Sequence, residues 1–361
     1  MYPFQRYLFR LDAERAHDLT LWALGMAGNF APARWILQAM FAAPSKPAHA
    51  FGLVFPNRVG LAAGYDKDAV AVRGLAALGF GHIEIGTVTP LRQPGNPKPR
   101  VFRLVEDEGV INRMGFPSRG SEFVQNQLNP HLRGDWFERV MGFSARRKRK
   151  QAAPRLTGQA ILGINIGKNK STPNDQAVLD YLELLQNFAQ YGDYLAINVS
   201  SPNTAGLRDL QGPKALEALL GQLHAQRLLE QTKLQRRVPL VVKLAPDLSP
   251  SEIDDAVDVV RSTHMDGIIV TNTTIGREGL RSANRSETGG LSGRPLARQS
   301  EAVLQQVVER VKGGLPIFSV GGIMSPADAR RRLDMGASFV QIYTGLVYCG
   351  PGLARNIVRV L

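Results

Sequence analysis

The sequence has few of the residues and segments that mark disulfide-bonded, metal-binding or membrane-spanning proteins. It contains one cysteine, Cys349, so no intrachain disulfide can form, and we expect this thiol to be a small buried packing residue. Its six histidines are scattered without ligand spacing, which predicts no metal site. Neither an unbroken run of about 20 apolar residues nor a secretory signal is present. We therefore expect a chain of the reducing cytosol without a membrane span.

The composition is that of a folded globular protein with an excess of positive charge. The chain has 361 residues, of which 44 are Lys or Arg and 31 are Asp or Glu, a net charge of +13. Five of these charges lie in residues 146–150, and such a run is usually a solvated loop, with an anionic membrane or nucleic acid as alternative partners. The aromatic residues are not interleaved with it and no zinc-finger spacing occurs, so we expect no nucleic-acid partner.

Residues 1–50 differ from the rest because their apolar side chains recur at helical spacing. Phe4, Tyr7 and Leu8 share one helical face, and Arg6 falls on the opposite one. Glycine, asparagine and proline interrupt the segment too often for a membrane span. We predict an amphipathic helical hairpin with two possible roles. In the first, the hairpin lies on a membrane or covers a hydrophobic opening. In the second, it packs on its own domain.

Beyond residue 50, eight short apolar runs alternate with helical stretches. Parallel strands need such crossovers, so the pattern predicts an α/β fold, a (β/α)8 TIM barrel over residues 51–361 with the N-terminal helical hairpin as an extension. A doubly wound open sheet would require a Gly-x-Gly-x-x-Gly turn after an early strand, and none is present. The predicted strands are residues 58–64, 82–88, 161–167, 194–200, 240–246, 267–273, 316–322 and 339–345, and the predicted helices include 68–78, 174–190, 214–230, 250–264, 298–312 and 326–335.

Polar residues or glycines follow nearly every predicted strand, at the rim where barrel active sites lie. Lys243 stands inside an apolar strand, where an unpaired ammonium would be costly. It either forms a structural salt bridge or holds positive charge against an anionic ligand. Gly321 and Gly322 follow the seventh strand, and Tyr343 and Thr344 follow the eighth, which predicts a site for a phosphate-bearing ligand.

Four asparagines, Asn112, Asn198, Asn203 and Asn272, lie on rim segments where ordinary loops more often carry charged residues. A single asparagine is most often a turn residue. Each side chain offers donors and an acceptor without charge. Together they favour a planar heterocycle with amide-like edges over a metal.

Seven motifs, in order along the chain, closely resemble those of the dihydroorotate dehydrogenase family. The resemblance runs from the first residues to the last strand, apart from roughly 125–160. Ser201 stands where the cytosolic class of the family has a cysteine base, and the hairpin is similar to the quinone-tunnel domain of the membrane-associated class. The resemblance thus points to the quinone-dependent class. The motifs are residues 62–67 (AAGYDK), 86–90 (GTVTP), 112–116 (NRMGF), 165–169 (NIGKN), 198–204 (NVSSPNT), 271–274 (TNTT) and 289–293 (GGLSG).

The resemblance implies oxidation of dihydroorotate to orotate in de novo pyrimidine biosynthesis, with FMN as hydride acceptor and a membrane quinone as final acceptor. Ser201 would be the general base that takes a proton from C5 while hydride passes from C6 to N5 of FMN, and Thr204 would relay the proton. The implied substrate residues are Lys67, Asn112, Arg113, Met114, Gly115, Phe116, Asn198, Asn203, Asn272 and Thr273. The implied FMN residues are Ala63, Gly64, Tyr65, Asp66, Lys67, Thr87, Asn165, Asn198, Lys243, Thr271, Gly293, Gly322, Tyr343 and Thr344.

For the second half-reaction, the resemblance places His17, Arg103 and Tyr343 beside a quinone that enters between the N-terminal helices. It implies a peripheral protein on the cytoplasmic side of the inner membrane. Two departures stand out. Pro117 occupies a position where the family commonly has asparagine, and the basic segment 144–160 resembles an insertion, for which we expect contact with an anionic membrane surface.

Two other enzyme classes fit this pattern less well. An FMN-barrel RNA dihydrouridine synthase would need a cysteine acid in a loop that has none here, and a separate RNA-binding domain. A phosphate-binding lyase or isomerase barrel would need neither Lys243 nor an apolar N-terminal hairpin.

Overall fold

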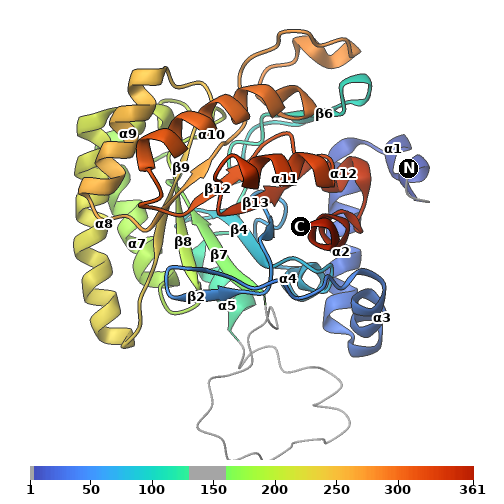
Figure 1. Cartoon of the computed structure of the whole chain (residues 1–361), viewed down its shortest axis with the longest axis horizontal. Helices are drawn as coiled ribbons and strands as arrows, with labels where there is room; N and C mark the ends of the chain where they lie inside the picture. The colour runs from blue at the N-terminus through green and yellow to red at the C-terminus, as the bar shows by residue number, and fades with distance from the viewer. Residues whose placement is uncertain (1–3, 130–159) are drawn as a thin grey trace, which may run out of the picture.

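A closed barrel of eight parallel strands forms the centre of the protein (Figure 1). The computed structural model describes residues 4–129 and 160–361. Around the barrel the strand order is β10-β12-β13-β3-β4-β7-β8-β9, and each strand lies within one of the eight predicted segments, which confirms the predicted barrel. The strands are β3 (Val59–Leu61), β4 (His82–Val88), β7 (Ile161–Ile166), β8 (Tyr194–Asn198), β9 (Leu240–Leu244), β10 (Gly267–Val270), β12 (Ile317–Val320) and β13 (Phe339–Ile342).

Three helices, over residues 121–128, 344–349 and 353–360, were not predicted. The six predicted helices are present around the barrel. One begins later than expected, since residues 68–71 lie outside helix α4. The Asp66 carboxylate accepts hydrogen bonds from the backbone N–H groups of Val70 and Ala71 and holds this stretch as a turn. The helices are α4 (Val72–Ala76), α5 (Ser121–Leu128), α7 (Ala177–Phe188), α8 (Pro213–Leu234), α9 (Pro250–Ser262), α10 (Ala297–Val311), α11 (Pro326–Asp334), α12 (Thr344–Cys349) and α13 (Leu353–Val360), with 3-10 turns at Val105–Asp107, Asn174–Gln176, Leu207–Gln211, Ala283–Ser286 and Arg294–Leu296.

Two small antiparallel sheets lie outside the barrel. A hairpin of β1 (Ala48–Ala50) and β2 (Leu53–Phe55) precedes the first barrel strand. A three-stranded sheet in the order β11-β6-β5 is built from β5 (Val101–Leu104), β6 (Gly109–Asn112) and β11 (Gly290–Gly293). Because β11 follows β10 in the chain and β6 follows β4, this second sheet lies beyond the carboxyl ends of the barrel strands.

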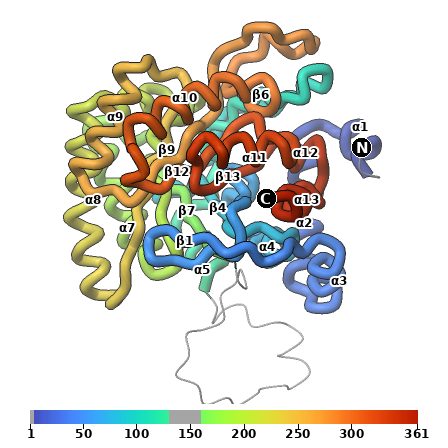
Figure 2. Tube along the Cα trace, in the orientation of Figure 1, coloured from blue at the N-terminus to red at the C-terminus, as the bar shows by residue number. Residues whose placement is uncertain are grey.

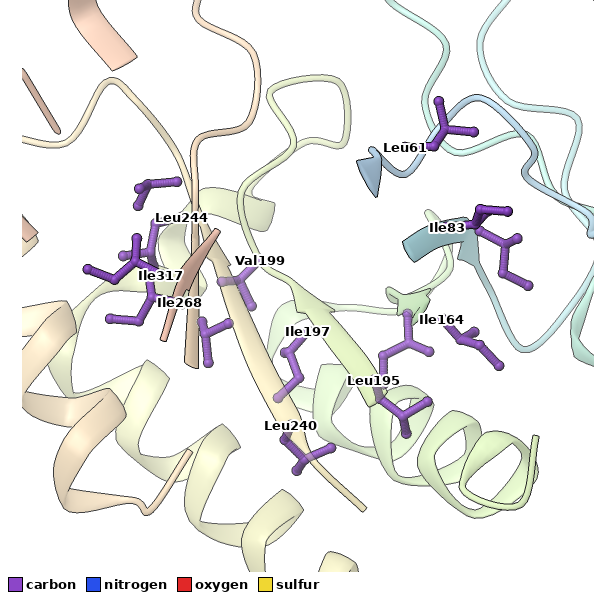
Figure 3. Packing of buried hydrophobic residues seen from close by; sticks show 14 of the residues in the cluster. Leu61, Ile83, Ile164, Leu195, Ile197, Val199, Leu240, Leu244, Ile268 and Ile317 are labelled. Carbon is purple, nitrogen blue, oxygen red and sulfur yellow. The ribbon is translucent and has the colours of Figure 1, made fainter. Parts of the chain in front are cut away.

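The apolar residues pack in two places. Leucine, isoleucine and valine side chains fill the space between the strands and the helices, as Figure 3 shows for Ile164, Leu195 and Leu240. Inside the barrel, aromatic rings close the end where the strands begin, with the ring centroids of Phe318 and Phe339 stacked 4.8 Å apart. The ring of His82, the first residue of β4, also lies among them, with its centroid 5.2 Å from that of Phe318.

The N-terminal segment forms three helices, α1 (Gln5–Arg10), α2 (Ala13–Asn29) and α3 (Ala31–Phe41). They lie beside α12 and α13, on the opposite side of the barrel from α8 (Figure 2). Helix α2 approaches α4 closely, because a Cβ atom on Gly28 would lie 2.3 Å from the backbone nitrogen of Gly74. The hairpin therefore packs on its own domain through one face, as one of the two interpretations predicts.

The other face of these helices carries exposed apolar side chains. Trp22, Trp35 and Tyr7 each have more than 60% of their surface exposed. Within the described part of the chain, each helix is too short or too polar to cross a bilayer.

Two other expectations have different outcomes. Cys349 is exposed, so the prediction of a buried packing residue is wrong. It is the last residue of α12, and its thiol donates a hydrogen bond to the backbone oxygen of Met324 at 3.1 Å. The basic run 146–150 and most of the predicted insertion 144–160 lie outside the described residues.

Candidate active site

A cavity opens at the carboxyl ends of the barrel strands. It encloses about 1000 Å³ of space not filled by atoms, its mouth included. Every predicted substrate-binding or cofactor-binding residue lines it except Tyr65, Asp66, Arg113 and Asn165, and so does Ser201. The parallel barrel brings these residues together because all eight carboxyl ends meet on one face.

The four remaining residues lie outside the lining of this cavity. Asp66 is fully buried and holds the turn before α4, and burial raises the pKa of its carboxyl to about 6. The Arg113 guanidinium points away to Glu287, at 2.6 Å, and stacks over the Phe102 ring. Tyr65 faces a neighbouring cavity described below.

Asn165 is the link between the cavity wall and the barrel interior. Its side-chain oxygen accepts hydrogen bonds from the Thr87 hydroxyl at 2.6 Å and from the Asn198 amide at 3.1 Å, and both of those residues line the cavity. Its amide donates to Glu84 at 2.9 Å. Asn165 therefore fixes the orientation of two lining side chains.

The four rim asparagines gather at the cavity as predicted. Asn203 donates from its amide to the Asn112 side-chain oxygen at 3.2 Å. Asn272 donates to the Asn198 oxygen at 3.3 Å and to the Ser200 hydroxyl at 2.9 Å. These mutual hydrogen bonds orient the amides before any ligand enters, and preorganised uncharged donors and acceptors suit a heterocycle with N–H and C=O edges.

Lys243 forms the structural ion pair that one of the two interpretations predicts. Its Nζ lies 3.7 Å from Oε1 of Glu84, whose side chain is fully buried on β4, so a structural ion pair exists. The residue also lines the cavity. Glu84 accepts further hydrogen bonds from the Tyr194 hydroxyl and the Gln341 amide, which hold the carboxylate in place below the cavity.

Lys67 contributes a second cation at the opposite wall. Its Nζ donates to the backbone oxygen of Gly64 at 2.6 Å. Burial lowers the pKa of this ammonium to about 8, so the group is mostly protonated at neutral pH. The cavity can therefore offer positive charge to an anionic ligand at both walls.

Ser201 lies in the loop after β8 and is 5% exposed. Its Oγ accepts a hydrogen bond from the backbone N–H of Asn203 at 3.3 Å. Close by in sequence, the buried Thr204 hydroxyl has no hydrogen-bond partner among the described residues. Arg208 braces this loop, because its guanidinium donates to the backbone oxygens of Ser200 and Thr273 while pairing with Asp247 at 2.7 Å.

The glycines at the far end of the cavity have backbone conformations that other residues rarely adopt. Gly321 and Gly322 have φ angles of +109° and +76°. A Cβ atom on Gly322 would lie 2.4 Å from the Cα of Ala297, so no side chain fits there. This end of the cavity can bring backbone groups close to a ligand, as a phosphate site requires.

A second cavity lies between the N-terminal helices and the barrel, with about 2020 Å³ of empty space, mouth included. Most of its lining is apolar, and the lining includes the three predicted residues His17, Arg103 and Tyr343. Burial lowers the pKa of His17 to about 3, so the imidazole is neutral at neutral pH. Residues common to the walls of both cavities are Asn112, Met114, Ser292 and Tyr343.

Sequence reasoning missed polar residues inside the barrel. Gln341 lines the first cavity, and both Gln341 and Glu84 are almost completely buried. Each is a polar residue within an apolar strand. The same pattern drew attention to Lys243, so the sequence could also have predicted a role for Gln341 and Glu84. In the parts of the chain that the structure describes, no three His, Cys, Asp or Glu side chains converge as metal ligands.

A closed parallel barrel with a cationic, amide-rich cavity at the carboxyl ends of its strands defines a (β/α)8-barrel enzyme. The family model described as dihydroorotate dehydrogenase matches residues 47–361, and the chain belongs to this family.

The similar proteins extend over nearly the full length. The chain is 44% identical over 352 residues to the protein named dihydroorotate dehydrogenase (quinone) of Idiomarina loihiensis, covering 97% of each chain. It is 45% identical to the protein of that name from Teredinibacter turnerae, covering 99% of this chain and 97% of the relative. The solved ligand-free DHODH of Eimeria tenella superposes with a TM-score of 0.81 at 39% identity, covering 96% of this chain and 93% of the other.

Proposed function

We propose that this protein oxidises dihydroorotate to orotate with FMN in the first cavity and passes the electrons to a quinone in the second, in pyrimidine biosynthesis. The observation that carries the proposal is the shared wall between the two cavities. An amide-rich cationic cavity holding Ser201 adjoins a larger apolar one. The names of the full-length relatives agree with this reaction.

The residues present fit FMN. Gly321 and Gly322 line one end of the cavity with backbone that no side chain covers, and amides and hydroxyls line the rest of the wall. Lys243 lies inside the barrel, where it would face the flavin ring. FMN supplies, when bound, the hydride acceptor that none of the side chains can provide.

Formation of the C5–C6 double bond of orotate removes a proton and a hydride from dihydroorotate. The Ser201 hydroxyl would take the proton from C5 as it releases its own proton, and the Thr204 hydroxyl, which has no hydrogen-bond partner among the described residues, would relay that proton to water. Serine is a weak base, so burial of the loop and the exclusion of water are part of this role. Lys67 and the four linked asparagines would hold the carboxylate and the ring of the substrate.

A quinone would bind in the apolar cavity, near His17, Arg103 and Tyr343. Arg103 is held there because its guanidinium donates to the backbone oxygen of Leu8 at 3.0 Å and lies over the Phe9 ring. Neutral His17 would offer hydrogen bonding without charge, which suits a quinone oxygen.

The test of this function is anaerobic reduction of the purified protein. We expect a flavin absorbance spectrum that dihydroorotate bleaches and that a quinone, added next, restores. The proposal fails if dihydroorotate does not bleach the flavin, or if fumarate or NAD restores the colour and quinone does not.

We also infer peripheral contact with an anionic membrane, on the cytoplasmic side of the inner membrane. Exposed Trp22 and Trp35 with the basic Arg6 and Arg10 form the amphipathic pattern of helices that lie in a bilayer interface. Replacing both tryptophans with glutamine is expected to weaken sedimentation with vesicles containing anionic lipid by about tenfold, the effect of about 1.4 kcal/mol.

The matched control for this prediction is Leu179→Gln on α7, an equally exposed apolar residue away from the N-terminal helices (Figure 1). It should bind vesicles as the unmodified protein does. Equal loss of binding in both variants would show that the N-terminal helices are not the contact surface.

A further inference from the structure

A chain of hydrogen bonds connects helix α2 to the loops that close over the first cavity. Its members, Glu14, Arg100 and Asn96, do not line that cavity, although Glu14 lines the second one. We call residues 112–117 the substrate loop and residues 199–206 the serine loop. The proposed function gives none of these three residues a role, although Glu14 and Arg100 are almost completely buried.

Asn96 is the contact point between the two loops. Its amide Nδ2 donates to the backbone oxygen of Arg113 in the substrate loop at 2.9 Å and to that of Asn203 in the serine loop at 3.3 Å. Its backbone N–H donates to the Met114 oxygen at 2.8 Å. The loops therefore share one donor, and a displacement of Asn96 moves both.

The space around Asn96 leaves little freedom for adjustment. Gly115 has φ +67°, and a Cβ atom there would lie 2.6 Å from the Asn96 amide nitrogen. On the outer side, Lys170 donates from its Nζ to the Asn96 side-chain oxygen at 3.0 Å. The amide is thus fixed with its nitrogen toward the two loops.

Arg100 holds Asn96 from below. Its Nη1 donates to the backbone oxygens of Pro94 at 2.7 Å and Asn96 at 2.9 Å, and its own backbone oxygen accepts from the Arg113 N–H at 2.8 Å. A guanidinium presents its donors in a rigid fork, so its orientation decides where these carbonyls lie.

Glu14 on α2 sets that orientation. Its carboxylate accepts from Nε and Nη2 of Arg100, with the shortest distance 2.8 Å, and both side chains are less than 10% exposed. Burial raises the pKa of Glu14, but hydrogen bonds from Arg100 and Lys98 outweigh it and the net shift is downward, so the group is ionised at neutral pH. Loss of one partner of a buried pair leaves the other charge uncompensated.

We propose that Glu14, Arg100 and Asn96 are positioning residues, through which the N-terminal helices hold the substrate and serine loops in place for dihydroorotate. The N-terminal helices then determine how tightly the first cavity binds dihydroorotate, in addition to how a quinone reaches the second cavity. This inference rests on the proposed function. Because coupling between sites is reciprocal, dihydroorotate binding also stabilises the docking of α2.

The test uses the flavin-loaded protein, mixed anaerobically with dihydroorotate in the absence of quinone, with flavin bleaching followed over time. Glu14→Gln is expected to raise the dihydroorotate Kd about tenfold with little change in the limiting rate. Asn96→Ser is expected to raise the Kd similarly. It should also lower the limiting rate, because the serine loop loses its hydrogen bond from the Asn96 amide. Glu14→Asp should recover part of the affinity.

Asp18→Asn is the matched control, since it makes the same change of charge one helical turn away at an exposed position of α2. It should leave Kd unchanged. Flavin content and bleaching by dithionite should be normal in every variant, which separates positioning from a general loss of structure.

The outcomes distinguish the inference from the function. Absence of bleaching in the unmodified protein refutes the proposed function itself. Normal bleaching with an unchanged Kd in Glu14→Gln overturns the inference and leaves the function intact. If Glu14→Gln does not fold, the test rests on Asn96→Ser, because Asn96 is only half-buried. An unchanged dihydroorotate Kd in Asn96→Ser then overturns the inference.

Discussion

Replacement of Ser201 by alanine is expected to slow flavin reduction by dihydroorotate by about 10²- to 10⁴-fold, the usual contribution of a general base. Flavin should stay bound, because the wall around Lys243 and Gly322 is not altered. Within residues 4–129 and 160–361, the Oγ of Ser201 accepts only a backbone N–H, from Asn203 at 3.3 Å, so removing it disturbs little of the loop. The loss should fall on the limiting rate of bleaching and much less on the Kd of dihydroorotate.

The measurement is stopped-flow bleaching under nitrogen. Ser292→Ala removes a hydroxyl from another part of the cavity wall and should slow bleaching less than tenfold. Ser201→Cys should retain part of the limiting rate of bleaching. That rate should rise with pH as the thiol ionises, since thiols ionise at much lower pH than alcohols. A limiting rate for Ser201→Ala near that of the unmodified protein would remove Ser201 as the base.

Replacement of Lys243 by methionine is expected to lower the free energy of unfolding by about 3 kcal/mol, because it leaves a buried carboxylate without its cation. Glu84 is fully buried, and in the variant it keeps its hydrogen bonds from Asn165, Tyr194 and Gln341. The same change removes a positive charge from the cavity wall, so flavin content should fall as well.

Urea unfolding at two concentrations of free FMN measures this effect, because the difference between them isolates the contribution of bound flavin. The double variant Lys243→Met with Glu84→Gln should recover most of the lost stability without recovering flavin binding. Equal unfolding midpoints for Lys243→Met and the unmodified protein would show that the pair contributes nothing to the stability of the barrel.

Much of the catalytic cavity could be predicted because it follows from local sequence and one topological rule. Eight apolar runs ending in polar residues predict eight strands, and a parallel barrel brings their carboxyl ends to one face. Ser201, Lys243, Asn198, Asn203 and Asn272 meet there for this reason, whereas Asn112 reaches the cavity from β6 of the outer sheet.

Two expectations failed where neighbouring structure outweighed local pattern. Residues 68–71 have helical spacing, but the Asp66 carboxylate takes the N–H groups of Val70 and Ala71 and delays the helix. Cys349 is of a type that is usually buried, yet the end of α12 leaves it exposed.

The sequence by itself determined the barrel, the face that carries the chemistry and the apolar character of the N-terminal helices. Only the tertiary structure decided which distant groups pair, as Glu14 does with Arg100 across 86 residues and Glu84 with Lys243 inside the barrel. The physical reason is that periodicity records which face of an element is buried. The partner of a buried charge depends on how the barrel closes and where α2 docks, and burial then makes that pairing obligatory.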